Sequence, residues 1–358
     1  MKRVVIAGAG KIGVTIADLL SATGDYDVTL ADRTSSAMAG VDAARVRCEE
    51  VDVRDSARLD ALLQGSFAVV SALPFDLTGE IASAAKRTEV HYLDLTEDVA
   101  TTRRAKQLAA DARTAFIPQC GLAPGFISIA AFDLAGRFDI LHDVRMRVGA
   151  LPKYASNALS YNLTWSTEGL INEYCEPCEA IVDGKRRETA PLEGLEEFLL
   201  DGVRYEAFNT SGGLGTLCET LQGKVRNLNY RSIRYPGHAA LMKALLHDLR
   251  LRERRDLFKD IMEYAIPATM QDVVIVFVTA TGVRGGRFIQ ETYANKIYSR
   301  EINGVMRSAI QATTAAGVCG VLDLLAEGKL PDRGFVRQED VSLPVFLANR
   351  FGRLYAQD

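Results

Sequence analysis

Short apolar runs rich in β-branched residues alternate with longer amphipathic segments through the first 120 residues. The runs are predicted to be strands at 4–7, 28–31, 68–71, 91–95 and 115–118, and the segments between them to be helices at 12–22, 58–63, 77–88 and 101–112. The stretch fits six strands, one more than the five runs located here. Strands that alternate with helices form parallel sheets, because each parallel connection needs a crossover. Residues 1–122 are therefore predicted to form one parallel-sheet domain.

The pattern changes after residue 121, where strand-like runs follow one another with few helices between them. These runs lie at 144–151, 161–166, 178–182, 185–188 and 203–208, with two longer ones at 273–281 and 287–295. Asp183-Gly184 and the segment 282–286 have the turn residues of hairpins. Residues 123–304 are thus predicted to form an α+β domain with a mixed, largely antiparallel sheet.

Helical patterns return at 239–264 and at 305–327. Residues 305–358 are expected to pack back on the first domain. The weakly polar stretch 309–326 contains Gln311, Thr313, Thr314 and Asp323 and is rich in alanine and glycine, which favours a close-packed buried helix over a membrane span.

Composition and charge favour a small-molecule partner. The chain has 358 residues, 48% of them apolar, and its 42 Lys and Arg against 46 Asp and Glu give a net charge of −4. Such a chain has no basic excess for nucleic acid or an anionic membrane.

Six cysteines are too few for a disulfide scaffold and fit a reducing compartment, so we expect a cytoplasmic protein. The apolar run at the N-terminus is interrupted by Lys11, which argues against a signal peptide.

A G-x-G-x-x-G motif at residues 8–13 follows the first predicted strand and opens the first predicted helix. In this context Gly8 permits a tight turn, Gly10 lets a pyrophosphate approach the backbone, and Gly13 lets the helix press on the strand. The alternative is a glycine-rich turn without a ligand. We therefore predict a Rossmann-type domain. Its expected cofactor-binding residues are Gly8, Gly10, Lys11, Ile12, Gly13, Asp32, Arg33 and Ala72.

Asp32 ends the second strand, where an acid binds both ribose hydroxyls and repels a 2′-phosphate. Arg33, Ser35 and Ser36 leave an alternative open, because a guanidinium and two hydroxyls can receive that phosphate. NAD is predicted over NADP.

Six blocks of sequence carry a family resemblance. They are residues 91–97 (HYLDLTE), 119–126 (QCGLAPGF), 165–174 (WSTEGLINEY), 207–220 (AFNTSGGLGTLCET), 234–238 (RYPGH) and 349–353 (NRFGR). With these blocks the chain resembles the saccharopine dehydrogenase-like family of amino-acid oxidoreductases over essentially its whole length, and the third to fifth blocks resemble its L-lysine 6-dehydrogenase branch. The resemblance implies NAD-dependent oxidation of the ε-carbon of L-lysine. The implied products are ammonia and allysine, which cyclises to 1-piperideine-6-carboxylate.

That chemistry needs a base and anchors for the substrate. Asp94 and Glu97 lie at the carboxyl end of a strand, where the ligand crevice of an open sheet is expected, although such acids also commonly cap helices. His238 is the third candidate base, since an imidazole accepts a proton near neutral pH, although a lone histidine is more often a structural hydrogen-bonding group. The catalytic candidates are therefore Asp94, Glu97 and His238.

Arg234 is predicted to anchor the substrate carboxylate. The glycine-rich loop with Ser211, Gly213 and Thr216 either assists it or is a plain turn. Trp165 and Glu168 either line the alkyl chain and bind an amine, or belong to core packing. The single C-x-x-C at 175–178 lacks the further ligands that zinc needs, so no metal is predicted.

Two alternatives remain at this stage. A saccharopine or carboxynorspermidine reductase using NADPH would need a second anion anchor, for which Arg231 and Arg204 are available. A non-catalytic NAD(P)-sensing protein would keep the fold without the chemistry. The long strands at 273–281 and 287–295 lead us to expect a homodimer or homotetramer.

Overall fold

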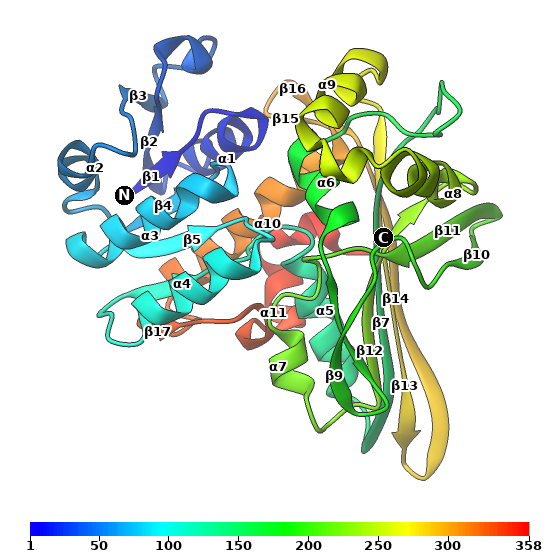
Figure 1. Cartoon of the computed structure of the whole chain (residues 1–358). Coiled ribbons are helices and arrows are strands. Elements are labelled where there is room, and N and C mark those ends of the chain that lie inside the picture. Colours follow the sequence, from blue (N-terminus) through cyan, green and yellow to red (C-terminus); the bar gives the residue numbers. More distant parts are fainter. Residues whose placement is uncertain (358) are drawn as a thin grey trace. The chain divides into compact units, whose positions relative to one another are not determined.

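The computed structural model describes residues 1–357, which form two compact units (Figure 1). Unit 1 contains residues 1–129, 301–305 and those from 311 onward, and unit 2 contains residues 130–300 and 306–310. Unit 1 extends beyond residue 122 because Phe126 stacks on Tyr355, with ring centroids 3.9 Å apart.

Unit 1 is built on a seven-stranded parallel sheet in the order β17-β6-β5-β4-β1-β2-β3. Its strands are β1 (Lys2–Ala7), β2 (Tyr26–Asp32), β3 (Val46–Glu50), β4 (Ala68–Ser71), β5 (His91–Asp94), β6 (Ala115–Ile117) and β17 (Gly334–Phe335). The order reverses direction beside β1. The carboxyl ends of β1 and β4 therefore flank the switch point, where open α/β sheets bind ligands.

The helices between these strands are α1 (Lys11–Ser21), the 3-10 turn η1 (Ser35–Met38), α2 (Ser56–Leu63), α3 (Phe75–Thr88) and α4 (Val99–Ala109). Residues of α2, α3 and α4 pack with Val5, Val69, Tyr92 and Phe116 in one hydrophobic core on one face of the sheet. Asp55 and Asp98 cap α2 and α4 by accepting backbone N–H bonds.

The rest of unit 1 comes from later in the chain. Its elements include the first residues of α5 (Phe126–Ala135), most of α10 (Ala309–Ala326), η4 (Gln338–Asp340), α11 (Leu343–Ala348) and η5 (Gly352–Tyr355). Helix α10 has the length and apolar composition of a membrane span, but 83% of it is buried inside the protein. That burial is typical of a core helix, and small residues allow it: a Cβ on Gly317 would lie 2.7 Å from two backbone carbonyl oxygens.

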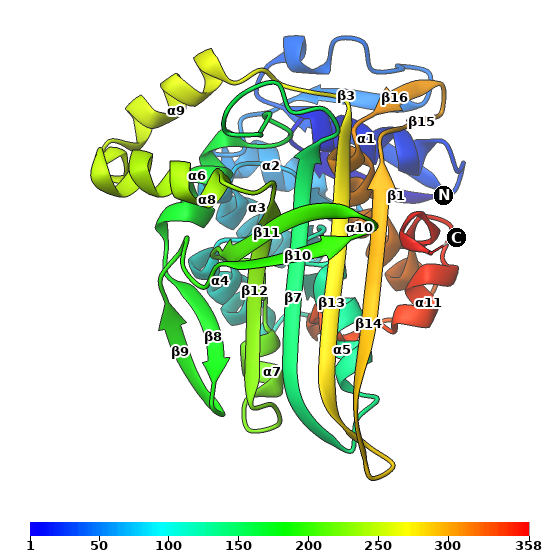
Figure 2. The ribbon, with the colours of Figure 1, turned by 90° about the vertical axis from the view of Figure 1, so that its right-hand side faces the viewer.

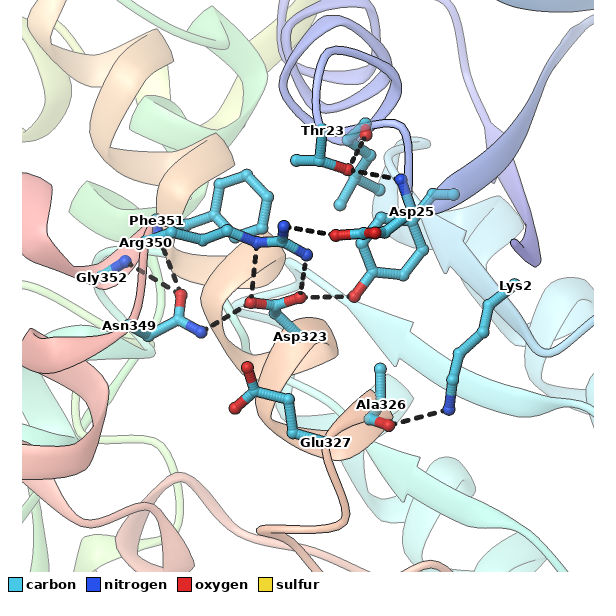
Figure 3. Close-up of polar contacts among 12 residues, drawn as sticks. Lys2, Thr23, Asp25, Asp323, Ala326, Glu327, Asn349, Arg350, Phe351 and Gly352 are labelled. Carbon is cyan, nitrogen blue, oxygen red and sulfur yellow. Dashed lines mark hydrogen bonds and ion pairs between the residues drawn. The ribbon is translucent and has the colours of Figure 1, made fainter.

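A buried carboxylate on α10 ties the end of the chain to β2 (Figure 3). Asp323 accepts hydrogen bonds from Tyr26 Oη at 2.6 Å, Asn349 Nδ2 at 2.7 Å and Arg350 Nη2 at 2.7 Å. Arg350 Nη1 also contacts Asp25 at 2.5 Å. The side chain of Asp323 is 2% exposed, so these partners supply the compensation that a buried charge requires.

Unit 2 is built on an eight-stranded mixed sheet in the order β10-β11-β12-β7-β13-β14, with β8 paired to β12 and β9 paired to β8. The strands are β7 (Ile140–Pro152), β8 (Cys178–Val182), β9 (Lys185–Thr189), β10 (Glu196–Leu200), β11 (Val203–Asn209), β12 (Asn227–Arg234), β13 (Asp272–Arg284) and β14 (Arg287–Tyr298). Only β7 and β12 pair in parallel; the other pairs are antiparallel. A short hairpin, β15 (Arg300–Ile302) and β16 (Val305–Arg307), follows β14.

The β10–β11 hairpin crosses in front of the central strands (Figure 2). Glu196 fastens it there, because its carboxylate binds Arg147 on β7 and, at 3.0 Å, Arg231 on β12. Phe198 packs against Phe277 with ring centroids 5.4 Å apart. The hairpin thus closes a second small core over the sheet.

Helices α6 (Thr167–Cys175), α7 (Leu217–Leu221), α8 (His238–Lys243) and α9 (Arg255–Ala265) complete unit 2, together with the π-helix η2 (Ala244–Asp248) and η3 (Leu251–Glu253). Residues of α6, α8 and α9 share a core with Phe208. This core surrounds the carboxyl end of β12, where Arg234, a predicted substrate-binding residue, and His238, a predicted catalytic residue, lie.

The structure confirms the predicted architecture of a parallel Rossmann-type sheet and a second, largely antiparallel mixed sheet. Six strands do lie within the first 120 residues. Two local predictions are wrong. Residues 161–166 form a loop with one isolated bridge rather than a strand, and residues 305–307 form β16, so that the last long helix begins at Ala309. The polar strands β3 and β10 were not predicted, and for β12 the sequence indicated only that a strand ends near Arg234.

We expect Arg350→Met to lower the free energy of unfolding by about 3 kcal/mol, because it leaves the buried Asp323 carboxylate without its cation. Arg333→Met is the matched control, since Arg333 and its partner Asp332 are both 76% exposed. Its effect should stay within about 0.5 kcal/mol. Urea unfolding measures both. Equal effects of the two substitutions would contradict the role assigned to Asp323.

Candidate functional site

Two of the three motif glycines are needed for packing, and the third faces open space. Gly8 has φ +106°, and a Cβ there would lie 2.7 Å from the Ala72 carbonyl oxygen. A Cβ on Gly13 would lie 1.8 Å from the Gly8 carbonyl oxygen. A Cβ on Gly10 would meet nothing within 4 Å. The loop therefore brings α1 close to β1 and β4 and leaves room in front of its N-terminus, whose N–H groups attract phosphate.

Asp32 fastens this loop to the end of β2. Its Oδ2 accepts the Ala9 N–H at 2.8 Å and its Oδ1 accepts the Thr34 N–H at 3.2 Å. Arg33 is exposed. The Ser35 N–H donates to Glu50 on β3, a residue that the sequence analysis did not single out. The sequence offered only one signal for Glu50, an acid at the end of a segment, and that segment is too polar to be predicted as a strand.

Asp94 is fully buried at the end of β5. Its carboxylate accepts hydrogen bonds from Tyr92 Oη at 2.5 Å, the Gln119 N–H at 2.8 Å and the Thr96 N–H at 3.0 Å. Burial raises the pKa of this carboxyl to about 6 even though these donors favour the charged form. Asp94 therefore holds the turns after β5 and β6 in place, and its catalytic role stays a prediction.

Glu97 differs from Asp94 because it is only half-buried. Burial raises its pKa, and the charges of Asp98 and Asp94 raise it further. The alternative that these acids cap the next helix does not hold, since Asp98 caps α4 by accepting the Thr101 N–H at 2.6 Å. Glu97 is thus the predicted acid whose carboxyl is best suited to proton transfer.

In unit 2 the structure brings Arg234 and His238 together through a tyrosine. Arg234 Nε donates to Tyr174 Oη at 2.8 Å, and Tyr174 Oη lies 3.1 Å from His238 Nε2. The guanidinium also lies over the ring of Tyr161, 5.2 Å from its centroid. Arg234 is 3% exposed, so the cation is held rigidly among aromatic rings.

His238 is a neutral, fixed ring rather than a base for neutral pH. Its Nδ1 lies 2.8 Å from the Leu159 carbonyl oxygen, so Nδ1 carries the proton and Nε2 accepts from Tyr174. Burial lowers its pKa to about 3, and the positive charge of Arg234 lowers it as well. The expectation that this imidazole takes up a proton near neutral pH does not fit these surroundings.

The loop with Ser211, Gly213 and Thr216 uses its polar groups within the protein. The Ser211 N–H donates to the Glu173 carbonyl oxygen at 3.0 Å, and its hydroxyl donates to the Asn172 carbonyl oxygen at 3.4 Å. Gly213 lies under the ring of Tyr230, where a Cβ would come within 2.3 Å. Thr216 is buried at the start of α7. The loop therefore packs against α6, and its substrate-binding role stays a prediction.

Trp165 and Glu168 lie on different sides of the start of α6. The Trp165 ring is half-buried and packs on Gly169, where a Cβ would come within 2.4 Å. Glu168 is exposed and lies 3.6 Å from Lys259 Nζ on the surface. Their contact with substrate stays a prediction.

The sequence analysis missed the residues that hold Arg234 and His238. Tyr161 and Tyr174 supply the aromatic walls, and Glu206 accepts the N–H groups of Gly237 at 2.8 Å and Ala239 at 2.6 Å at the start of α8. The register pairs Glu206 with Arg234, but the sequence indicated only that a strand ends near Arg234 and not which strand it pairs with, so this neighbour was not predicted. Among residues 1–357 all six cysteines are free and no cluster of metal-ligating side chains occurs.

We expect Gly10→Ala to fold normally and to weaken dinucleotide binding at least tenfold, because the new methyl occupies the space that a pyrophosphate needs. Gly13→Ala is the contrasting variant and should lose stability, since its methyl meets the Gly8 carbonyl. Calorimetric titration with dinucleotide and thermal unfolding separate the two. Unchanged binding by Gly10→Ala would contradict the proposed phosphate position.

The lowered pKa of His238 predicts a pH-dependent stability. In the unfolded chain the His238 imidazole has a pKa of about 6.5, so it is protonated below this pH, whereas the folded ring stays neutral. The free energy of unfolding therefore falls as the pH falls. Relative to His238→Asn, whose amide can still donate to Leu159, the wild type should lose about 1.4 kcal/mol per pH unit between about pH 6 and pH 4. Urea unfolding across this range tests it. If the free energies of unfolding of the wild type and His238→Asn change in parallel with pH, the neutral buried ring is contradicted.

Models of two protein families match the chain. The saccharopine dehydrogenase NADP-binding domain matches residues 4–117, and the saccharopine dehydrogenase C-terminal domain matches residues 121–354. The first match identifies unit 1 as carrying a nicotinamide dinucleotide-binding domain. The glycine loop described above lies within it.

Relatives with known roles share only part of their length with this chain. Saccharopine dehydrogenase [NADP(+), L-glutamate-forming] of Saccharomyces cerevisiae is 25% identical over 262 residues, which cover 68% of this chain and 57% of the yeast protein. The mitochondrial alpha-aminoadipic semialdehyde synthase of Mus musculus is 22% identical over 193 residues, 51% of this chain and 21% of that protein. The matched region thus spans about half of the yeast relative and a fifth of the mouse one.

A solved structure shares the fold over nearly the full chain. Apo saccharopine dehydrogenase (L-Glu forming) from Saccharomyces cerevisiae superposes with a TM-score of 0.80 at 16% identity, covering 97% of this chain and 96% of that one. At that identity the likeness shows the fold. Because the two family models together match nearly the whole sequence, the chain belongs to the saccharopine dehydrogenase family.

Proposed function

We propose that this protein is an NAD-dependent dehydrogenase that oxidises the ε-carbon of L-lysine, giving allysine and ammonia. Family membership and the dinucleotide-binding domain support a dehydrogenase of amino acids. The resemblance of residues 165–174, 207–220 and 234–238 to the lysine 6-dehydrogenase branch supports lysine. We also propose that it works in the cytoplasm as a homodimer or homotetramer.

The choice of lysine rests on which arginines of unit 2 are paired, exposed or buried. Saccharopine has more carboxylates than lysine, so an enzyme acting on it needs further cationic anchors. Arg231 shares the carboxylate of Glu196 with Arg147, and Arg204 is exposed. Of the candidate anchors, only Arg234 lies in the buried aromatic cluster. One such anchor suits a substrate with one carboxylate.

The residues present fit a nicotinamide dinucleotide. The open space at Gly10 and the N-terminus of α1 suit the pyrophosphate, and Asp32 suits the ribose hydroxyls. When bound, NAD supplies the acceptor for the hydride that leaves the ε-carbon. The protein's own residues bind the substrate and accept the proton that it releases.

We assign those tasks to a few side chains. Arg234 binds the α-carboxylate and is kept in place by Tyr174. Glu97 takes the proton from the ε-ammonium, because its raised pKa gives it more basicity than an ordinary surface carboxylate. Asp94 holds the turn that follows β6. Loss of the hydride leaves a C=N bond at the ε-carbon; water then adds to this carbon, and ammonia leaves to give the aldehyde.

Purified protein with L-lysine and NAD should form NADH and ammonia in equal amounts. NADP, L-ornithine and saccharopine are the comparison reactants. Arg234→Gln should raise KM for lysine at least tenfold, whereas Arg204→Gln, an exposed cation of the same unit, should leave it unchanged. Absence of lysine turnover would contradict the proposal.

A second candidate reaction is the oxidation of saccharopine with NADP, the reverse of saccharopine formation. Two findings favour it: the name of the matching NADP-binding family and the yeast relative. Turnover of saccharopine with NADP, and of no free lysine, would move the assignment to this reaction.

A further inference from the structure

Two acids end neighbouring strands at the cofactor edge of unit 1. Asp32 is the last residue of β2 and Glu50 the last of β3, and the parallel register pairs them. The Val51 N–H donates to the Asp32 carbonyl oxygen at 2.8 Å, which fixes that register. Neighbouring strands lie about 4.8 Å apart, so the two backbones hold the acids side by side.

Both acids bind the turn that follows β2. Asp32 Oδ1 accepts the Thr34 N–H at 3.2 Å, and Glu50 Oε2 accepts the Ser35 N–H at 3.1 Å. This turn is where Arg33, Ser35 and Ser36 would have to receive a 2′-phosphate. Two successive N–H groups of the turn are therefore already engaged by carboxylates of the protein.

We propose that Glu50 is a second cofactor-specificity residue, which acts with Asp32 to exclude a 2′-phosphate and so selects a dinucleotide with a free 2′-hydroxyl. The inference rests on the cofactor choice in the proposed function. A phosphate carries a charge of about −1.5 to −2 near neutral pH, and here it meets two carboxylates instead of one. It must also displace Glu50 from the Ser35 N–H before it can bind there.

The cations near this edge do not neutralise the pair. Arg33 is exposed, and Arg58 Nη2 donates at 2.9 Å to the backbone carbonyl oxygen of Glu50 rather than to its carboxylate. Glu50 is exposed as well, so its effect on an anion is screened by salt. Discrimination against the phosphate should therefore weaken as ionic strength rises.

Glu50→Gln is the informative substitution, because the amide oxygen can still accept the Ser35 N–H while the charge is removed. Glu49→Gln is the matched control, since Glu49 is the preceding exposed residue of β3 and its side chain points to the opposite face. Calorimetric titration with NAD and NADP, at low and high salt and without amino-acid substrate, gives the ratio of the two dissociation constants.

We expect the wild type to bind NAD more tightly than NADP. Glu50→Gln should tighten NADP binding about fivefold to tenfold at low salt, with NAD unchanged within about twofold, and should reduce the salt dependence of the ratio. Glu49→Gln should match the wild type. The inference is overturned if Glu50→Gln and Glu49→Gln behave alike, or if the wild type binds NADP as tightly as NAD.

Failure here can be separated from failure of the proposed reaction. A wild type that prefers NAD through Glu50 but does not oxidise lysine keeps this inference and removes the proposed reaction. A wild type that oxidises lysine with NADP as readily as with NAD removes this inference and keeps the lysine chemistry.

Discussion

The close approach of Gly13 to the Gly8 carbonyl is the contact on which the cofactor edge depends. A side chain at either glycine would push α1 away from the ends of β1 and β4. With both glycines in place, the N-terminus of α1 lies at the switch point of the sheet, and the Ala9 N–H reaches Asp32. The same residues that let the helix pack thus also bring Asp32 and the N-terminus of α1 to one place, where we propose that the ribose and the phosphates bind.

The corresponding constraint in unit 2 is a buried cation. Arg234 sits at the end of β12 among Tyr161 and Tyr174, and the neutral His238 completes the hydrogen-bond chain. A rigid guanidinium loses little entropy when it binds a carboxylate. By contrast Arg147 and Arg231 share Glu196 and serve to fasten the β10–β11 hairpin. Burial and pairing, more than the number of arginines, therefore separate Arg234, the proposed anchor, from the structural arginines.

The sequence was sufficient for the Rossmann-type sheet, because strands buried on both faces are apolar and glycine spacing is strict. It failed where an element is polar or where contacts are distant. β3 ends with exposed acids, so neither the strand nor the neighbour relation of Asp32 and Glu50 was visible. The residues at 161–166 have the apolar and aromatic character of a strand, yet they form a loop, in which Tyr161 packs against Arg234 and the Asn162 side chain and the Leu163 N–H donate to the Pro267 carbonyl oxygen. The tautomer of His238 depends on Leu159 and Tyr174, far from it in the chain, and its low pKa follows from burial and from the charge of Arg234.

The central claim is that the ε-carbon of lysine gives up the hydride. Mass spectrometry of the NADH formed from lysine deuterated at the ε-carbon tests it directly. The reduced cofactor should carry one deuterium, and lysine deuterated at the α-carbon should give unlabelled NADH. Label transferred from the α-carbon instead, or from neither position, would contradict it.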